Sequence, residues 1–128
     1  MSRSFLIDSD VLIDHLRKDR QALEFLSREL DAGSLLFISV ISRTEILAGI
    51  RKGEEEAIAT LFDLLSPVDV DASIADKAGE YLRRLARSHA LSIGDALIAA
   101  TCREMGLTLV TRNIKHYPMK DIGVVKPY

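Results

Sequence analysis

The sequence predicts an α/β fold, a three-layer α/β/α sandwich in which helices cover both faces of a central parallel sheet of four to five strands. Strand-like and helix-like segments alternate along the chain, and this alternation within one domain favours a parallel sheet. The strand-like run at residues 35–39 is continuously apolar up to its last residue, which is typical of a strand buried on both faces. With 128 residues, the chain is expected to form one domain over residues 1–128.

The chain is expected to begin with one strand followed by two helices. Residues 4–7 contain a short apolar run that predicts a buried strand. Ser9 is the expected N-cap of a helix over residues 9–17. A second helix is predicted over residues 20–32, because its leucines have helical spacing and Gly33 stands just past its end.

The strand at residues 35–39 is expected to lead into a pair of helices. Ser42 should open the first of them, which is expected to end near residues 49–53. The second is predicted over residues 54–65. It should stop before Pro67, because proline disfavours the helical conformation in the residue before it.

The remaining segments continue the alternation. A short strand is expected at residues 68–70, followed by a long amphipathic helix over residues 72–89. A helix over residues 94–105 includes an uncharged apolar stretch and should be buried on several sides. Residues 107–111 predict another strand, and residues 124–125 a short final one.

The composition is that of an ordinary globular protein, with 48% apolar and 28% charged residues. No apolar stretch is long enough to span a bilayer and the N-terminus has no signal-peptide pattern, so we expect no membrane partner. The single cysteine, Cys102, lies in an apolar segment and is expected to be a small buried side chain. One cysteine allows no internal disulfide, and this favours a cytoplasmic location.

The net charge of −2 predicts no broadly basic surface of the kind that usually marks a nucleic-acid-binding protein. RNA is not excluded as a substrate, because a bound divalent cation reverses the local sign of an acidic pocket. Basic residues also gather locally, as between Arg112 and Lys120, although such clusters are more often solvated helix faces or loops.

Four polar residues are the candidate functional residues, because each lies at the end of a strand-like run or near the start of a helix. They are Asp8, Glu45, Asp95 and Asn113. In an open parallel sheet, ligands bind at the carboxyl ends of the strands, beside the starts of the following helices. Residues far apart in the sequence can therefore share one pocket. Three acids and an amide in one pocket favour a hard cation and phosphate chemistry.

Each acid also has a purely structural interpretation. Ser42 with Glu45, and Ser92 with Asp95, fit the capping-box pattern, in which the acid accepts a hydrogen bond from the backbone of the cap. Asp8 would accept hydrogen bonds from backbone N–H groups of the turn at the end of its strand. A cap contributes only about 1 kcal/mol. Two carboxylates about 5 Å apart repel by roughly 3 kcal/mol at an effective dielectric near 20.

If the three acids converge, a cation is needed to offset their repulsion. The positions that share a helix face with Asp95 or Glu45 are mostly apolar or small, which favours an inward direction for both carboxylates. Carboxylate and amide oxygens suit Mg²⁺ or Mn²⁺, whereas zinc would require histidine or cysteine ligands. The three histidines have no metal-ligand spacing, so Mg²⁺ is the expected cofactor, with Mn²⁺ as the alternative.

At these residues the sequence resembles the PIN-domain nucleases, especially the VapC toxins of toxin–antitoxin pairs. The similarity extends over nearly the whole chain and is carried by four segments in a fixed order. These are residues 5–14 with Asp8, residues 39–49 with Glu45, residues 94–100 with Asp95, and residues 109–113 with Asn113.

The resemblance implies a metal-dependent endoribonuclease that hydrolyses RNA to leave a 5′-phosphate and a 3′-hydroxyl. Asp8, Glu45 and Asp95 would be the acidic metal cluster, with Ser9 and Thr111 as nearby auxiliary hydroxyls.

Asn113 stands at the position where many PIN domains have a fourth acidic residue, and it is not an acid. Its neutral amide removes one charge from the site, which argues against a second, tightly held metal. Arg112 and Lys115 would position backbone phosphates of the RNA without reading its sequence.

The resemblance also implies protein partners. Family members often form homodimers and are usually inhibited by a cognate antitoxin whose tail covers the pocket. The contact with the antitoxin is expected on the helical pair at residues 42–65.

Two other functions compete with this hypothesis. The neutral Asn113 and the acidic overall charge suit a catalytically silent PIN-like module that binds RNA or a protein. Asp8-Ser9-Asp10 after an apolar strand also resembles the nucleophile motif of haloacid dehalogenase-type phosphatases. The later lysine and paired acidic motif of those enzymes have no counterpart here.

Overall fold

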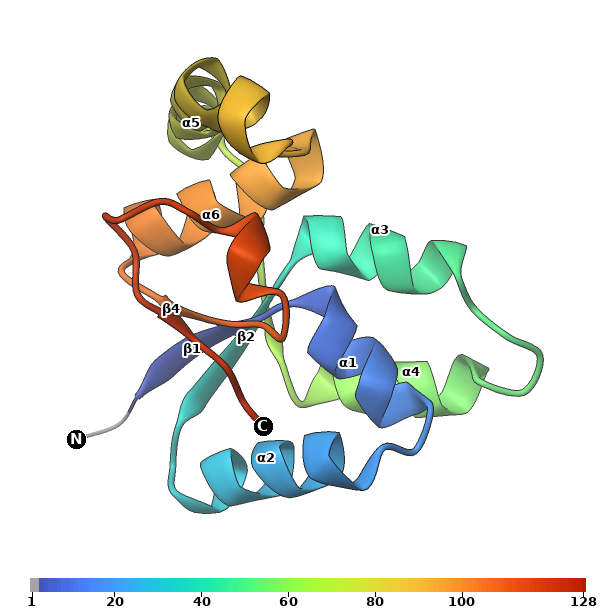
Figure 1. Cartoon of the computed structure of the whole chain (residues 1–128). Helices are drawn as coiled ribbons and strands as arrows, with labels where there is room; N and C mark the ends of the chain where they lie inside the picture. Colours follow the sequence, from blue (N-terminus) through green and yellow to red (C-terminus); the bar gives the residue numbers. More distant parts are fainter. Residues whose placement is uncertain (1–2) are drawn as a thin grey trace.

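The computed structural model describes residues 3–128 and confirms the predicted sandwich, with a five-stranded parallel sheet between two layers of helices (Figure 1). The strands are β1 (Ser4–Ile7), β2 (Leu35–Ser39), β3 (Ser66–Val68), β4 (Thr108–Val110) and β5 (Val124–Val125). The helices are α1 (Ser9–Leu16), α2 (Arg20–Asp31), α3 (Val40–Ala48), α4 (Glu55–Asp63), α5 (Ala72–His89) and α6 (Ile93–Met105), with a short 3₁₀ turn at Ile114–His116.

The strand order is β3-β2-β1-β4-β5, so the first strand of the chain lies at the centre of the sheet. On one side β1 pairs with β2, and on the other it pairs with β4, where Ile7 lies opposite Val110. The chain therefore adds β2 and β3 on one side of β1, and later adds β4 and β5 on the other side. The carboxyl ends of β1 and β4 form the switch point at which ligands bind in such sheets.

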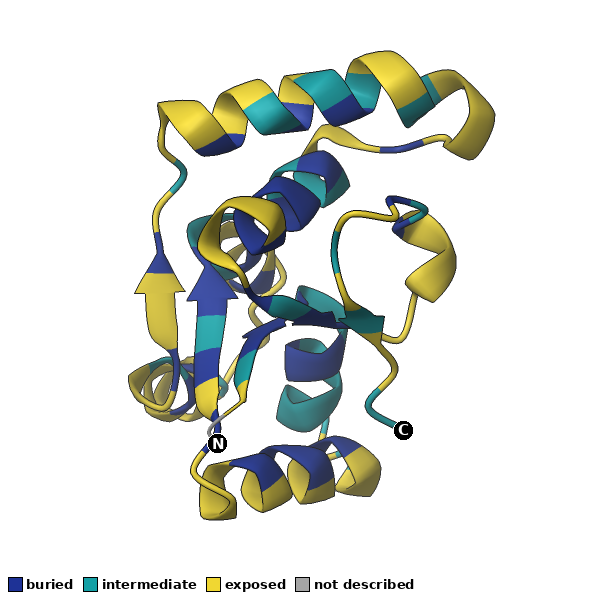
Figure 2. Cartoon of the chain, turned by 90° about the vertical axis from the view of Figure 1, so that its left-hand side faces the viewer, coloured by how far each residue is buried: buried dark blue, intermediate teal, exposed yellow. Residues whose placement is uncertain are grey.

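Two apolar cores flank the sheet, because successive residues of β1 point to opposite faces. Leu6 packs toward α5 and α6, in the core that also contains Tyr81 and Ile98. Ile7 packs toward the other helical layer, in the core that contains residues of α1, α2 and α4. Figure 2 shows α5 and α2 at opposite ends of the molecule, each with its buried side turned inward.

Helix α3 contacts both α1 of one layer and α6 of the other. It therefore lies across the edge of the sheet where the strands end, and it brings Glu45 to the switch point. Among residues 3–128, no helix is both long enough and apolar enough to cross a membrane. Cys102 is buried in the core between the sheet and α5, as expected.

Three local expectations were wrong. Asp8 rather than Ser9 is the N-cap of α1, because the Asp8 carboxylate accepts the Ser9 N–H. Helix α3 begins at Val40 rather than at Ser42, because the Ser39 hydroxyl accepts the Ile41 N–H and starts the helix earlier. The third strand is Ser66–Val68 rather than residues 68–70.

Candidate functional site

Asp8 lies directly after the central strand and is the most buried acid of the site, with 7% of its surface exposed. Its Oδ1 accepts the backbone N–H of Ser9 at 2.8 Å. Its Oδ2 accepts the Thr111 hydroxyl at 3.0 Å and the Tyr117 hydroxyl at 2.8 Å. Thr111 and Tyr117 come more than a hundred residues later in the chain, and the pairing of β1 with β4 brings them to Asp8.

Asp95 is joined to Asp8 through Tyr117. The carboxylate of Asp95 lies in the first turn of α6, and its Oδ1 is 3.3 Å from the Tyr117 hydroxyl. The same hydroxyl donates to Asp8, so the two acids lie on either side of one oxygen atom. The Nδ1 of His116 lies 3.7 Å from the other carboxylate oxygen of Asp95.

Glu45 approaches this pair from α3. Its Oε1 accepts the Ser9 hydroxyl at 3.2 Å, so Ser9 links the helix that follows β1 to the helix that follows β2. The side chain of Glu45 is exposed, whereas the sequence predicted an inward direction. The site therefore has a buried side at Asp8 and an open side at Glu45.

The capping-box interpretation holds in part for Asp95 and fails for Glu45. The Ser92 hydroxyl accepts the Asp95 N–H at 3.0 Å and caps α6, while the Asp95 carboxylate faces Tyr117 and His116. Ser42 caps nothing: its hydroxyl is buried within α3 without a partner among the described residues. Glu45 is therefore free of a capping duty.

Burial and neighbouring acidic charges raise the pKa of Asp8 and of Glu45. Burial raises the pKa of Asp8 to about 6, and the charge of Asp10 adds to this effect against the hydrogen bonds from Tyr117 and Thr111. Partial loss of hydration raises the pKa of Glu45, and the charges of Asp95 and Asp10 raise it further. The acids are thus close enough to repel one another, which is the condition under which a cation would stabilise them.

Asp10 and Asp14 connect α1 to the segment after β4. The Oδ2 of Asp10 accepts the Arg112 N–H at 3.0 Å and the Thr111 hydroxyl at 3.3 Å. The Nε of Arg112 pairs with Asp14 at 2.6 Å, and the Tyr128 hydroxyl also donates to Asp14 at 2.6 Å. The guanidinium of Arg112 is therefore already held by a carboxylate.

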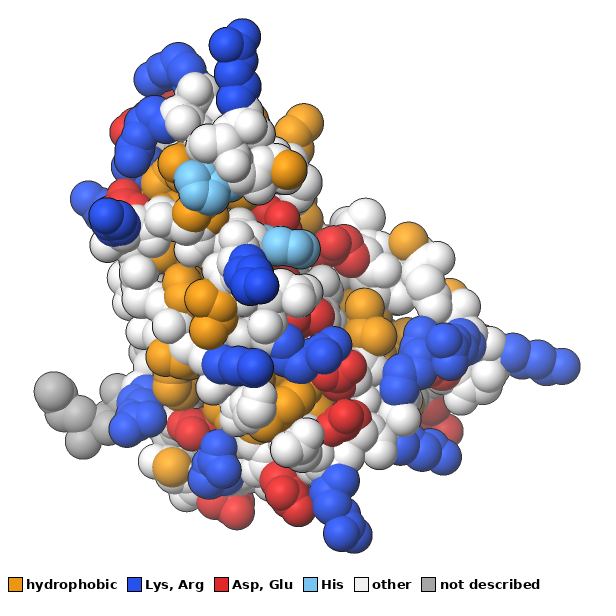
Figure 3. All heavy atoms as spheres, viewed as in Figure 1, with side chains coloured by type: hydrophobic (Ala, Val, Ile, Leu, Met, Phe, Trp, Pro, Cys, Tyr) orange, Lys and Arg blue, Asp and Glu red, His pale blue; other side chains and the backbone are white. Residues whose placement is uncertain are grey.

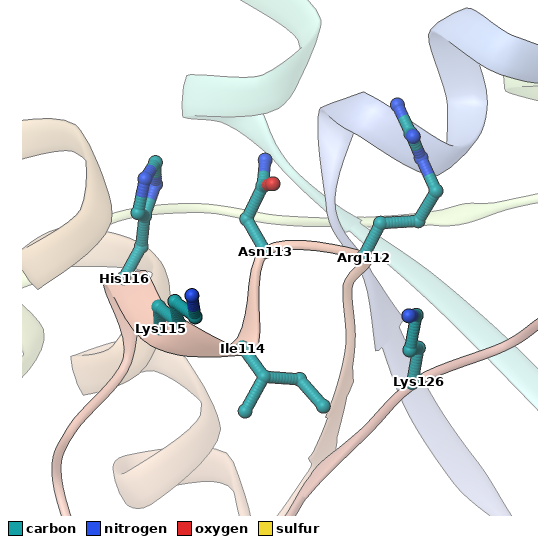
Figure 4. A pocket seen from close by; sticks show the side chains of 6 residues that line it. All are labelled: Arg112, Asn113, Ile114, Lys115, His116 and Lys126. Carbon is teal, nitrogen blue, oxygen red and sulfur yellow. The ribbon is translucent and has the colours of Figure 1, made fainter.

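A basic hollow of about 400 Å³ adjoins the acids (Figure 4). It is lined by Arg112, Asn113, Ile114, Lys115, His116 and Lys126. In Figure 4 the side chains of Asn113 and His116 project to the same side, whereas Ile114 points away from them. In the part of the chain that the structure describes, Lys115 and Lys126 form no ion pair. Figure 3 shows acidic side chains along the middle of this face, with lysine and arginine side chains beside them.

Asn113 itself makes no side-chain hydrogen bond to the described acids. Its backbone N–H donates to the Thr111 hydroxyl at 3.1 Å, which orients the hydroxyl that reaches Asp8. The structure thus brings Asp8 and Asp95 together at the Tyr117 hydroxyl, with Thr111 beside Asp8, and it brings Glu45 to Ser9. Asn113 lies at the border between the acids and the basic hollow.

Comparison with known proteins identifies the family. The family model of the PIN domain matches residues 5–121. The chain belongs to the PIN-domain family. Ribonuclease VapC10 of Mycobacterium tuberculosis is 40% identical over 115 residues, which cover 89% of this chain and 86% of the relative. Ribonuclease VapC19 of the same organism is 35% identical and covers 89% of this chain and 92% of its own length.

A solved toxin-antitoxin complex from Klebsiella pneumoniae contains a chain of the same fold. It is 28% identical with a TM-score of 0.74, and the match covers 96% of this chain and 97% of that chain. Together with the two ribonucleases, it confirms the resemblance to VapC proteins that the four sequence segments indicated.

The donor set of this PIN domain fits a hard cation, because its converging side chains offer carboxylate and hydroxyl oxygens. Within residues 3–128, however, no three His, Cys, Asp or Glu side chains stand close enough together to hold a metal ion by themselves. Mg²⁺ usually takes one or two carboxylates and completes its shell with water and phosphate oxygens. Asp8 and Asp95 therefore suit an ion that the substrate helps to hold.

Two residues of the site were not predicted from the sequence. Tyr117 lies in the loop after the 3₁₀ turn, and only the general need of a buried tyrosine hydroxyl for a partner could have indicated its role. Lys126 follows β5, whose pairing with β4 brings it to the basic hollow. No motif in the sequence marks either residue.

Proposed function

We propose that this PIN domain is a metal-dependent endoribonuclease toxin that is neutralised by a cognate antitoxin. The observation that carries the proposal is the pair of carboxylates, Asp8 and Asp95, on either side of one hydroxyl at the switch point of the sheet. The names of the relatives, ribonucleases VapC10 and VapC19, support RNA as the substrate.

Asp8 and Asp95 are the residues that would hold Mg²⁺ or Mn²⁺. When bound, the ion would stabilise charge on the phosphodiester and make water more acidic. Glu45, which is exposed and has one carboxylate oxygen without a partner among the described residues, would orient a water molecule and accept its proton. Thr111 and Ser9 keep Asp8 and Glu45 in place by donating their hydroxyls to them.

The basic hollow would bind the RNA backbone next to the acids. Lys115 and Lys126 are the available cations, because neither is paired with a described acid. Arg112 would contribute only where a phosphate competes with Asp14 for its guanidinium. Such contacts fix the position of the strand without selecting its bases.

Substitution of Asp8 by Asn tests the proposal. Asp8→Asn removes a ligand charge at nearly constant volume, and we expect RNA cleavage to fall at least a hundredfold. Asp121→Asn is the matched control, because Asp121 also accepts a tyrosine hydroxyl, at 2.7 Å, but lies before β5, where it pairs with side chains of α5 and α6 instead of the site. Cleavage by Asp8→Asn at the wild-type rate would show that the assignment of Asp8 to the catalytic site is wrong.

The catalytically silent module is the second candidate, because no three acids converge by themselves among the described residues and Asn113 is neutral. It predicts that millimolar Mn²⁺ leaves the melting midpoint of the chelator-treated protein unchanged, whereas a cation site raises it.

The antitoxin is proposed to bind the α3–α4 pair. Three large apolar side chains are exposed there: Leu47, Ile50 and Leu64 each have 40 to 49% of their surface exposed. Exposed apolar side chains that lie together favour the binding of another protein. Leu47→Asp with Ile50→Asp should abolish co-purification with a co-expressed cognate antitoxin and leave RNA cleavage intact. Leu23→Asp on α2, where Leu23 is 51% exposed, is the control. Retained co-purification would place the partner elsewhere.

A homodimer is also part of the proposal. Light scattering of the purified chain tests it, and a monomer at micromolar concentration would contradict it.

A further inference from the structure

The Tyr117 hydroxyl lies between the two most central acids of the site. It donates to Asp8 at 2.8 Å and is 3.3 Å from Asp95, and the residue is only 4% exposed. One proton therefore serves two carboxylates in a place from which bulk water is largely excluded. Hydrogen bonds to charged acceptors are stronger than those between neutral groups.

Core packing of the ring and a backbone hydrogen bond hold Tyr117 in place, so the position of its hydroxyl is fixed. The ring packs in the apolar core with Met119, Leu91 and residues of α6. The backbone N–H of Tyr117 donates to the carbonyl of Ile114 at 3.0 Å. Because the ring cannot follow the carboxylates, they must keep their orientation to stay in contact with the hydroxyl.

Within the described residues, no lysine or arginine side chain orients the two carboxylates in place of the Tyr117 hydroxyl. In residues 3–128, neither Asp8 nor Asp95 pairs with a lysine or arginine, and the imidazole of His116 is the only basic group within ion-pair distance of Asp95. The neutral hydroxyl is thus the main link between two acids that would otherwise repel each other.

The hydroxyl also leaves oxygen lone pairs available. A carboxylate offers about four lone-pair sites. The Oδ2 of Asp8 is saturated by Thr111 and Tyr117, while its Oδ1 accepts only the Ser9 N–H. Donation from Tyr117 therefore directs Asp8 without consuming the oxygen that remains open to a cation.

We infer that Tyr117 is a positioning residue of the cation site, whose hydroxyl holds the Asp8 and Asp95 carboxylates in the arrangement that a divalent cation binds. The inference rests on the proposed function, since it concerns the same two acids. It assigns Tyr117 no contact with the RNA. Groups that orient metal ligands in this way typically contribute ten- to a hundredfold to metal affinity.

The chain provides two matched controls for the test. All three of its tyrosines donate their hydroxyls to an aspartate: Tyr117 to Asp8, Tyr81 to Asp121 at 2.7 Å, and Tyr128 to Asp14 at 2.6 Å. A change from tyrosine to phenylalanine therefore removes the same kind of hydrogen bond at each position. Only Tyr117 touches the acids of the site.

The experiment is a calorimetric titration of the full chain with Mn²⁺, in the wild type and in the variants Tyr117→Phe, Tyr81→Phe and Tyr128→Phe. We expect Tyr117→Phe to weaken Mn²⁺ binding about tenfold or more. The two control variants should bind Mn²⁺ as the wild type does, even where their melting temperatures fall. At limiting Mn²⁺ RNA cleavage by Tyr117→Phe should fall below that of the wild type, and saturating Mn²⁺ should restore it.

The outcomes separate the inference from the proposed function. Unchanged Mn²⁺ affinity in Tyr117→Phe, with a binding wild type, overturns the inference alone. Tighter binding in Tyr117→Phe also overturns it, because the hydroxyl would then compete with the cation. Equal losses in all three variants would show a general effect of stability and contradict a special role of Tyr117. A wild type that binds no Mn²⁺ removes the cation site and the inference with it.

Discussion

Asp8 is a buried acid with two duties, since its carboxylate caps α1 and also receives hydroxyls from the far end of the chain. Burial raises its pKa to about 6 although three groups donate to it. The ionised form of Asp8 is thus less favourable in the folded protein than in the unfolded chain. A buried acid kept in such a place is typical of a functional site rather than of a stabilising one.

This perturbed acid predicts the dependence of stability on pH. The folded protein binds the Asp8 proton more tightly than the unfolded chain, because the pKa rises from 3.8 to about 6 on folding. The contribution of Asp8 to the free energy of unfolding therefore decreases as pH rises through this interval, by about 2 to 3 kcal/mol in total. Asp8→Asn should gain stability relative to the wild type by that amount between about pH 4 and about pH 7.5.

Urea denaturation at the two pH values, with a chelator present, measures this difference. Asp63→Asn, on the exposed part of α4, is the control for the change of charge. A stability difference between Asp8→Asn and the wild type that is the same at both pH values would contradict the prediction.

The candidate residues could be found from the sequence where a local pattern marks them. Asp8 follows an apolar strand and Asp95 follows the cap of a helix, and both patterns survive in the fold. Tyr117 had no such mark, because its role depends on a ring anchored in one core and two acids supplied by other elements. The exposure of Glu45 was also missed, since a helical face says nothing about the space beyond it.

At the scale of elements, two glycines in neighbouring helices predict opposite responses to the same substitution. Gly79 lies within α5, and a Cβ added there would meet nothing within 4 Å. Gly79→Ala should raise the free energy of unfolding by about 0.5 to 1 kcal/mol, because alanine has less backbone freedom to lose. Gly106 ends α6 with φ +66°, and Gly106→Ala should lower it by about 1 kcal/mol.

Thermal melting of the two variants beside the wild type measures both effects, and each variant is the control for the other. A gain in both, or a loss in both, would mean that backbone conformation does not decide the outcome.

The order and type of the elements could be predicted because hydrophobic periodicity is strong in this chain, while their ends depended on side-chain competition. Ser39 and Ser42 are both acceptable caps in the sequence, and the structure uses Ser39 because β2 ends there. Asp8 likewise takes the capping position that Ser9 was expected to fill. In both cases the cap is the residue at the strand end, so the end of the strand determines which of the two candidate side chains caps the helix.

At the scale of the whole molecule, the basic hollow predicts how RNA affinity depends on salt. In an Asp8→Asn background that leaves RNA uncleaved, Lys115→Ala or Lys126→Ala should weaken binding of all RNA sequences alike. Each change should also reduce the slope of log affinity against log salt by about 0.7, the value for one phosphate on a single strand.

Fluorescence anisotropy at several salt concentrations measures the slope. Arg83→Ala on the exposed side of α5 removes one positive charge away from the hollow and should leave the slope unchanged. An equal loss of slope in Arg83→Ala would show that net charge, rather than the hollow, attracts the RNA.

The position of β1 at the centre of the sheet has a consequence for synthesis on the ribosome. Asp8 emerges well before β4, Thr111 and Tyr117, which complete its surroundings and are made about a hundred residues later. A translation product that stops before β4 lacks half the neighbours of its central strand and cannot assemble the acidic pair. A nascent chain would therefore lack the proposed cation site until β4 and Tyr117 have been made.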